Sequence, residues 1–334
     1  MLTERGHIVA IAAPEGSYLP KDDPSLNNIS LIQIPGALQP TAQTQGRQTS
    51  VVTESALANI WDYAQRIQSQ YDLLVNFAYD WLPFYLTPFL SAPVAHFVSM
   101  GSLSDRLDQA ISQTSARFPG RLGAYSQAQA DTFESVEDWE ILGFGLDIER
   151  YEYCDRPDDY LAWVGRISPE KGLEDAILAA ELAEKSLKIF GKLEHKDYWE
   201  KLQPLIEQVR QTVDVEYCGF LSTAALQEQV GRSQALLMTP KWIEAFGIVA
   251  VEALACGVPV VAYRRGGPAE IVRDGENGWL VEPDDVAKLA IAANRANNIE
   301  RQSCRKGAIA HYSLSAWGQR FERWFCRIVA ENSR

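Results

Sequence analysis

The sequence predicts an α/β protein built from two Rossmann-like, doubly wound domains with parallel sheets. Its 334 residues exceed one ordinary domain and are enough for two that each bury a core. Short runs rich in valine, isoleucine, leucine and alanine alternate with longer amphipathic runs, which is typical of parallel strands joined by crossover helices. We therefore expect residues 1–145 and 146–313 to form two domains that face a cleft.

The first half contains four expected strands and one long helix. The strands are expected at residues 7–13, 72–78, 93–100 and 121–126, and the helix at residues 53–69. The chain opens on a helical turn that Gly6 ends, directly before the first strand. We expect a strand and a helix that would normally precede this point to be missing, which would expose apolar sheet edges.

The second half is more regular. Strands are expected at residues 160–164, 187–190, 213–218, 235–239, 258–263 and 279–281, with helices starting near residues 172, 194, 223, 246, 284 and 300. Ligands of such a doubly wound unit collect at the carboxyl ends of its strands. The charged stretch 142–156 predicts the domain boundary. A last helix within residues 314–334 carries an aromatic stripe that we expect to pack across to the first domain.

Composition excludes several classes of partner. The net charge is −13, and the first 145 residues are strongly acidic, so nucleic acid and anionic membranes are not expected partners. No window approaches the ~18 uninterrupted apolar residues of a membrane helix. The five cysteines are scattered without metal-ligand spacing, which indicates a reducing, cytoplasmic setting and no metal site. The oligomeric state cannot be predicted from this sequence.

Two motifs of the second half follow expected strands. Gly165 and Arg166, then Lys171 and Gly172, lie between a strand and a helix, where backbone and cations can meet a phosphate. The alternative is a turn with two surface cations. Glu244 precedes a helix expected to start near Phe246. Its alternative role is a carboxylate that only favours the helix dipole.

A third motif is Gly266 and Gly267 followed by Glu270, which alone is also an ordinary turn. Together the three motifs closely resemble glycosyltransferase family 4, a retaining family with the GT-B fold. The resemblance covers nearly all of residues 155–330. It implies an enzyme that transfers a hexose from a nucleotide sugar without a metal or other cofactor.

The resemblance also implies site residues. Arg166 and Lys171 would grip the donor diphosphate, Glu244 would contact the donor sugar, and Glu252 would accept hydrogen bonds from the ribose. The implied donor-binding residues are Gly165, Arg166, Lys171, Gly191, Phe220, Leu221, Phe246, Gly247, Ile248 and Glu252. The implied catalytic residues are Glu244, His96, Arg166 and Lys171. Relatives begin with a strand and a glycine-rich loop, and this chain starts after both.

The acceptor is expected in the first domain, at Tyr79, Trp81 and His96. Tyr79 stands where some relatives have histidine, which puts a catalytic role there in doubt. The whole sequence looks similar to cyanobacterial pteridine glucosyltransferases, which implies UDP-glucose as donor and a small acceptor such as tetrahydrobiopterin. The alternatives are a transferase of the family with a sugar or lipid acceptor, another enzyme on this scaffold, and a nucleotide-binding module inactive because its N-terminal part is missing.

Overall fold

The computed structural model describes residues 1–20, 26–38 and 54–332, which divide into two compact units. Unit 1 comprises Met1–Tyr125, Ala130–Leu142 and Gly318–Arg334, and unit 2 comprises Ser126–Gln129 and Gly143–Trp317. The first long stretch of unit 2 thus begins at the start of the predicted boundary, residues 142–156. The predicted helix start at Thr53 lies outside the described residues.

Unit 1 contains two separate parallel sheets. Strands β1 (Val9–Pro14) and β2 (Ile29–Ile34) pair with each other in the register Val9 to Ile29. The second sheet has the order β3 (Leu74–Asn76), β4 (Val94–Phe97), β5 (Leu122–Ala124) and β6 (Trp139–Ile141). The sequence predicted β1, β3, β4 and β5 and missed β2 and β6. Strand β6 has Glu140 at its centre and is partly exposed along its length, so it lacks the apolar run that marks the equally short β5.

Helices α2 (Ala56–Ile67), α3 (Trp81–Leu86) and α4 (Asp105–Arg117) also belong to unit 1. Side chains cap two of them: Ser55 Oγ accepts from the amide of Ala58, and Asp80 Oδ1 accepts from the amide of Leu82. Short 3-10 turns η1 (Thr3–Arg5), η3 (Gln68–Gln70) and η4 (Thr87–Phe89) complete the described elements of this unit.

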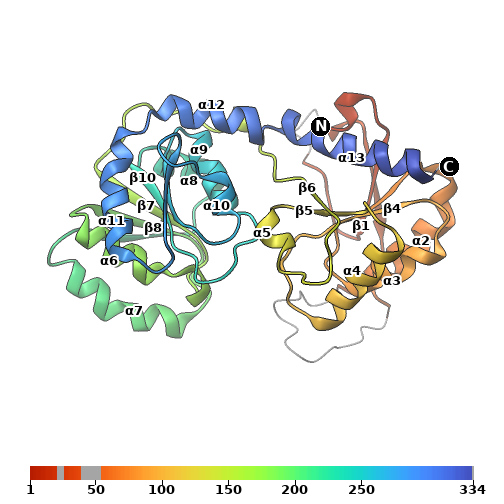
Figure 1. The fold of residues 1–334 in the computed structure, drawn as a ribbon, viewed down its shortest axis with the longest axis horizontal. Coiled ribbons are helices and arrows are strands. Elements are labelled where there is room, and N and C mark those ends of the chain that lie inside the picture. Colours follow the sequence, from red (N-terminus) through yellow and green to blue (C-terminus); the bar gives the residue numbers. More distant parts are fainter. Residues whose placement is uncertain (21–25, 39–53, 333–334) are drawn as a thin grey trace. The chain divides into compact units, whose positions relative to one another are not determined.

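The last helix, α13 (Leu314–Asn332), packs into unit 1 from Gly318 onward (Figure 1). The side chains of Phe321, Trp324 and Ile328 are almost fully buried. Trp324 Nε1 donates to the carbonyl of Gly120 at 2.7 Å, and Arg320 Nε donates to the carbonyl of Leu142 at 2.7 Å. The aromatic stripe of the sequence therefore lies in the core of unit 1.

Unit 2 is one six-stranded parallel sheet with helices on both faces (Figure 1). Its strands are β7 (Tyr160–Val164), β8 (Ser186–Phe190), β9 (Val215–Gly219), β10 (Ala235–Met238), β11 (Val260–Tyr263) and β12 (Gly278–Val281). The order is β12-β11-β10-β7-β8-β9, the doubly wound order of a Rossmann fold. The predicted strands and helix starts of this half agree with the structure to within about two residues.

Helices α6 (Leu173–Leu182), α7 (Lys196–Val209) and α11 (Val286–Arg295) contact one another over one face of this sheet. Helices α8 (Thr223–Gly231), α9 (Ile248–Ala255) and α12 (Arg301–Tyr312) do so over the other. Shorter segments are α5 (Gln127–Ala130), α10 (Pro268–Ile271), η5 (Ile148–Arg150), η6 (Pro169–Lys171) and η7 (Ala296–Asn298). The core beneath the first face includes Trp163, Ile177, Ile189 and Tyr263.

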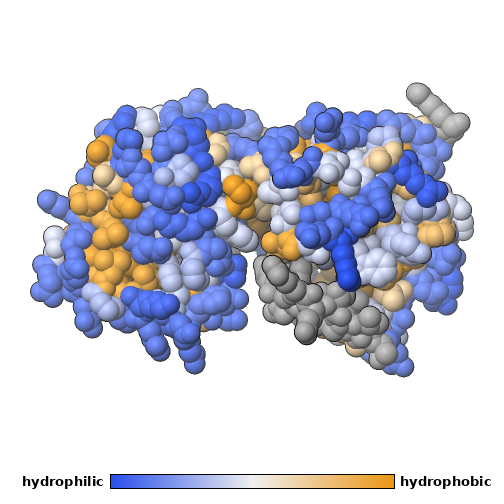
Figure 2. All heavy atoms as spheres, turned by 60° about the horizontal axis from the view of Figure 1, so that its bottom comes forward, coloured by the Kyte–Doolittle hydropathy of each residue, from blue (hydrophilic) through white to orange (hydrophobic). Residues whose placement is uncertain are grey.

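Hydrophilic side chains dominate the visible face of each unit, with smaller hydrophobic areas among them (Figure 2). The charged residues, 22% of the sequence, and the net charge of −13 agree with this surface. Within residues 1–20, 26–38 and 54–332, no helix is long and apolar enough to cross a membrane.

Candidate functional site

The candidate site lies at the centre of the unit 2 sheet, where the strand order reverses. Strands β7 and β10 are neighbours there, and successive strands extend outward from them in opposite directions. Residues 165–172 leave the carboxyl end of β7, and residues 239–247 leave the carboxyl end of β10. Such a switch point leaves room for a ligand between diverging loops. The first two predicted motifs therefore meet at one end of the sheet.

Lys171 and Glu244 form an ion pair at this point. Lys171 Nζ contacts Glu244 Oε2, and the indole Nε1 of Trp242 donates to the same oxygen at 3.1 Å. The lysine ammonium also lies 5.2 Å from the centre of the Trp242 ring, within cation–π range. The side chains of Lys171 and Glu244 are 19% and 16% exposed. Lys171, which is predicted to bind phosphate, and Glu244, which is predicted to contact the donor sugar, are therefore paired with each other here.

Arg166 is also paired with carboxylates. Its guanidinium lies 2.7 Å from Glu194 Oε2 and 3.0 Å from Glu170 Oε1. Partial burial opposes the charged form, but hydrogen bonding and attraction to Glu194 outweigh it and raise the pKa of Arg166. Ser168 Oγ donates to Glu170 Oε1 at 2.7 Å. A diphosphate that used Arg166 would have to share the guanidinium with these carboxylates or replace them.

The backbone of the two loops is held together at Gly172. This residue has φ of 62°, and a Cβ there would lie 2.1 Å from the carbonyl oxygen of Thr239. The Thr239 hydroxyl donates to the Gly172 carbonyl at 2.7 Å and accepts from Trp163 Nε1 at 3.2 Å. Glycine at position 172 is required by this close approach of two loops, and not only by the approach of a phosphate.

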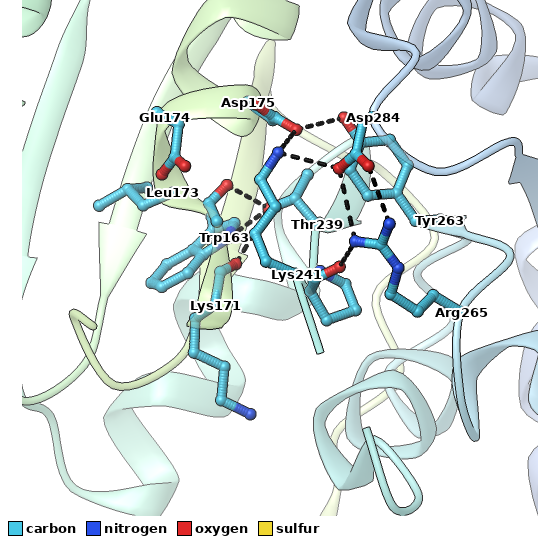
Figure 3. Close-up of polar contacts among 12 residues, drawn as sticks. Trp163, Lys171, Leu173, Glu174, Asp175, Thr239, Lys241, Tyr263, Arg265 and Asp284 are labelled. Atoms are coloured by element: carbon cyan, nitrogen blue, oxygen red, sulfur yellow. Dashed lines mark hydrogen bonds and ion pairs between the residues drawn. The ribbon is translucent and has the colours of Figure 1, made fainter. Parts of the chain in front are cut away.

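A network of charges fixes the outer part of the β10 loop (Figure 3). Lys241 Nζ contacts Asp175 Oδ2 and lies 3.0 Å from Asp284 Oδ1. Tyr263 donates to Asp175 Oδ2 at 2.6 Å, and Arg265 contacts Asp284 at 2.8 Å. Burial opposes the ammonium form of Lys241, but its hydrogen bonds to the two aspartates prevail and raise its pKa. We call Asp175, Lys241, Tyr263, Arg265 and Asp284 the anchoring network.

The Lys171 side chain points away from the anchoring network in Figure 3. Lys241 lies only three positions before Glu244, and Arg265 also donates to the carbonyl of Pro240 at 2.8 Å. The network therefore fixes the loop that carries Glu244 while leaving Lys171 directed elsewhere.

The third motif supports Glu244 from the β11 side. The amide of Gly267 donates to the carbonyl of Glu244 at 2.7 Å, and a Cβ on Gly267 would lie 2.4 Å from Phe246 Cα. Glu270 accepts from the amides of Gln127 and Ala128 at 3.0 and 2.7 Å. The paired glycines thus serve the packing of two loops, and the Glu270 carboxylate is occupied by backbone.

Glu252 lies in α9 and lines a second part of the site. Its Oε1 accepts a hydrogen bond from the Tyr151 hydroxyl at 2.9 Å, and burial raises the pKa of Glu252. Both residues border a small pocket that is open to solvent. The pocket is lined by Tyr151, Val164, Thr223, Leu226, Gln227, Val230, Val249, Glu252 and Cys256. Val164 ends β7, so this pocket adjoins the switch point.

The helix α9 begins one to two residues later than expected. Gly247 is its N-cap with φ of 92°, so Phe246 precedes the helix and Ile248 opens it. The Phe246 side chain is 5% exposed and lies 6.0 Å from the Tyr312 ring, while Ile248 is 38% exposed. The first amides of a helix have no intrahelical partner. Only the backbone of Phe246, Gly247 and Ile248 is therefore suited to bind an anion here.

Three further residues implied for donor binding, Gly191, Phe220 and Leu221, follow the ends of β8 and β9. Gly191 donates its amide to the carbonyl of Gly219 at 2.9 Å, and a Cβ on it would lie 1.8 Å from the Gly165 carbonyl oxygen. Phe220 is 79% exposed, and Leu221 is partly buried. Gly165 and Gly191 therefore allow tight loop packing, and Phe220 is free to stack on a planar group.

His96 lies in the core of unit 1 and is fully buried. Its Nε2 lies 2.8 Å from Thr87 Oγ1, its Nδ1 lies 3.2 Å from Asn76 Nδ2, and its ring stacks on Phe84 at 4.3 Å. Thr87 Oγ1 donates to the Pro83 carbonyl, so His96 Nε2 carries the proton toward Thr87. Burial first, then the charge of Arg121, lowers the pKa of His96 to about 3. Both nitrogens of the neutral ring are thus occupied.

The other two predicted acceptor residues do not converge with His96. The Tyr79 hydroxyl donates to the Gly101 carbonyl at 2.6 Å, and burial together with Asp108 raises its pKa. Trp81 is 47% exposed and contacts Tyr85 edge-on at 5.6 Å. The structure therefore brings the donor residues of unit 2 together and leaves the three acceptor residues with separate partners.

Comparison with known proteins gives a consistent assignment for the second half. Residues 154–310, slightly less than half of the chain, match the family described as Glycosyl transferases group 1. Two curated relatives are a D-inositol 3-phosphate glycosyltransferase of Acidothermus cellulolyticus, 41% identical over 92 residues, and a glycogen synthase of Mycobacterium tuberculosis, 30% identical over 189 residues. The matches cover 27% and 53% of this chain and 20% and 44% of those proteins. The chain thus spans less than half the length of these relatives.

Solved structures resemble the whole chain. HepE of Anabaena in complex with UDP and glucose has a TM-score of 0.70 at 20% identity, covering 91% of this chain and 88% of that one. A sucrose-phosphate synthase from Thermosynechococcus elongatus has a TM-score of 0.71 at 17% identity, covering 99% and 91%. These likenesses confirm the GT-B fold class, and the family match supports glycosyltransferase group 1 membership.

Proposed function

We propose, from the premise that residues 154–310 are those of a group 1 glycosyl transferase, that the chain transfers a hexose from a nucleoside diphosphate sugar to a small acceptor. The observation that carries this proposal is the meeting of Arg166, Lys171 and Glu244 at the switch point of the unit 2 sheet. A doubly wound sheet binds nucleotides at that place. Two cations together with the backbone amides at the start of α9 suit a diphosphate.

The proposed chemistry follows from the charges that develop during transfer. The bond between the anomeric carbon and the diphosphate breaks, an acceptor oxygen bonds to that carbon, and the acceptor proton leaves with the diphosphate. Negative charge on the leaving group is stabilised by Arg166, Lys171 and the amides before α9. We propose that these groups act without a metal and that the configuration at carbon is retained.

Glu244 has two successive partners in this proposal, Lys171 and the donor sugar. In the structure it neutralises Lys171 through a direct ion pair. When a diphosphate takes over Lys171, the carboxylate is released and faces the donor sugar near the reacting carbon. Exchange of one anion for another keeps Lys171 from being buried without a partner in either state.

The donor base is proposed to be uracil and the sugar glucose. The Anabaena HepE structure, which shares this fold, contains UDP and glucose. In our chain, the exposed ring of Phe220 at the end of β9 offers a stacking surface for a base.

The acceptor is proposed to be a reduced pterin such as tetrahydrobiopterin, on the basis of the sequence resemblance described above. The names of curated relatives favour a second candidate, a sugar acceptor, because they include glycogen synthase and sucrose-phosphate synthase. Both acceptor classes use the same donor half, so only turnover with each acceptor distinguishes them.

Calorimetric titration with UDP, GDP and ADP in EDTA tests the donor site without an acceptor. We expect selective, metal-independent binding of UDP and a large loss of affinity in Lys171→Ala. Folded protein that binds none of the three nucleotides would contradict the donor site. Transfer from UDP-glucose would then be compared between reduced pterins and sugars, and turnover of sugars alone would contradict the pterin assignment.

A further inference from the structure

Tyr151, which lies outside the three motifs, contacts Glu252 in the pocket beside α9. Tyr151 lies just after η5, in the charged stretch that the sequence marks as a boundary. Its hydroxyl donates to Glu252 Oε1 at 2.9 Å across 101 positions of sequence. Within the described residues, no other side chain hydrogen-bonds the Glu252 carboxylate. Tyr151 therefore sets the orientation of that carboxylate.

The backbone of Tyr151 is tied to the same helix that carries Glu252. Arg305 of α12 donates through one nitrogen to the carbonyl of Tyr151 and to the carbonyl of Ala255, the last residue of α9. The Tyr151 amide also donates to the Ile148 carbonyl at 3.0 Å. Tyr151 is therefore linked to α9 twice, at its backbone through Arg305 and at its hydroxyl through Glu252. Two such links leave the phenol little freedom to move.

The pocket around this contact has the composition of a ligand site. Its walls are mostly apolar, from Val164, Leu226, Val230 and Val249, and its polar groups are few. Tyr151 is 7% exposed, so its phenol serves as a fixed donor at the pocket wall. Oε2 of Glu252 makes no hydrogen bond to a described residue and is the oxygen available to a ligand.

We propose that Tyr151 is a positioning residue that holds Glu252 so that its carboxylate accepts the ribose hydroxyls of a nucleoside diphosphate. This inference rests on the proposed function, because it assigns the pocket to the nucleoside of the donor. Tyr151 does not contact the reacting atoms. Its effect reaches the ligand only through Glu252, which makes the effect separable from a general loss of stability.

The test compares UDP with dideoxy-UDP, which lacks both ribose hydroxyls, on wild-type protein and Tyr151→Phe. Loss of a hydrogen bond to a charged group predicts about tenfold weaker UDP binding. Affinity for dideoxy-UDP should change little, so the ratio of the two affinities should fall. Tyr160→Phe is the matched control, because buried Tyr160 also loses one hydrogen bond, to the Gln229 carbonyl, and should keep the ratio.

The pH dependence of UDP binding is a second readout. Burial raises the pKa of Glu252 and the Tyr151 hydrogen bond lowers it. Tyr151→Phe should therefore move the acidic limb of binding to higher pH, which a purely structural role would not do. In Glu252→Gln protein, adding Tyr151→Phe should weaken UDP binding no further.

The outcomes separate this inference from the proposed function. Wild-type protein that prefers UDP to dideoxy-UDP, with the same preference in Tyr151→Phe, would overturn the role of Tyr151 and leave the donor site intact. Folded wild-type protein that binds no nucleotide would overturn both. If Tyr151→Phe melts below the assay temperature, Arg305→Lys serves instead, and an unchanged ratio in that variant overturns the inference.

Discussion

Replacing Lys241 by methionine should destabilise unit 2, because the anchoring network depends on this one ammonium group. Lys241 lies between Asp175 and Asp284, and the side chain of Asp175 is only 9% exposed (Figure 3). Methionine keeps most of the apolar stem and removes the charge. Among the residues drawn in Figure 3, the Asp175 carboxylate would then keep the hydrogen bond from the Tyr263 hydroxyl, which is uncharged and cannot neutralise it.

The expected loss can be worked out from burial. Removing one partner of a fully buried ion pair lowers the free energy of unfolding by ~3–5 kcal/mol. Here the Lys241 side chain is 29% exposed and Tyr263 still donates to Asp175, so the loss should be about 2–3 kcal/mol. The exposed contact with Asp284 adds at most about 1 kcal/mol. For a domain of this size, the melting temperature should fall by roughly 5–10 °C.

Thermal unfolding followed by circular dichroism and calorimetry measures this loss. Lys185→Met is the matched control: its lysine pairs at 2.7 Å with Asp159, whose side chain is 77% exposed, so little should change. Adding Asp175→Asn to Lys241→Met should recover part of the stability, because the unpaired charge is removed. A loss in Lys241→Met no larger than in Lys185→Met, or no recovery in the double variant, would refute the reasoning.

Three further predictions concern the site and the core. Glu244→Gln should lower turnover at least tenfold while UDP affinity stays or rises, because it frees Lys171 from its ion pair; calorimetry showing a large loss of UDP affinity would contradict this. Gly172→Ala should cost at least about 2 kcal/mol, since its Cβ would overlap Thr239; an unchanged melting temperature would contradict it. The pKa of His96 in the folded protein is about 3, below its unfolded value. Its contribution to the free energy of unfolding is therefore complete above about pH 6.5 and falls by ~1.4 kcal/mol per pH unit toward pH 3. Urea unfolding should show that His96→Gln loses less stability at acidic pH than the wild-type protein.

The regular half of the fold could be predicted from sequence because its strands are buried on both faces. Strands such as β7 and β10 are continuous apolar runs between turn residues, so their place and order follow from pattern alone. In unit 1 the pattern is weaker. In strand β2, Ser30 and Gln33 interrupt the apolar residues, and among the described residues the strand pairs with β1 alone, so it lacks the apolar run that marks a central strand.

Residues of the candidate site could be predicted where a sequence motif directly follows a strand. They could not be predicted where the role of a residue depends on a partner distant in sequence. Arg166 and Lys171 are local features of one loop. Their pairing with Glu194 and Glu244 joins residues 28 and 73 positions apart, which no local pattern encodes. The contact of Tyr151 was not predicted for the same reason. Its partner Glu252 lies far away in sequence, in α9, and the stretch around Tyr151 resembles a linker.

The paired cations also explain how an acidic chain can hold a dianionic ligand. Because Arg166 and Lys171 are paired with Glu170, Glu194 and Glu244, these five side chains together carry no excess of positive charge. A diphosphate that takes over Lys171 would displace the Glu244 carboxylate, which must then find water or a sugar hydroxyl. Nucleotide alone supplies no sugar hydroxyl to Glu244, whereas a nucleotide sugar does. In the proposed reaction, this geometry would favour the intact donor over the free diphosphate product and would assist product release.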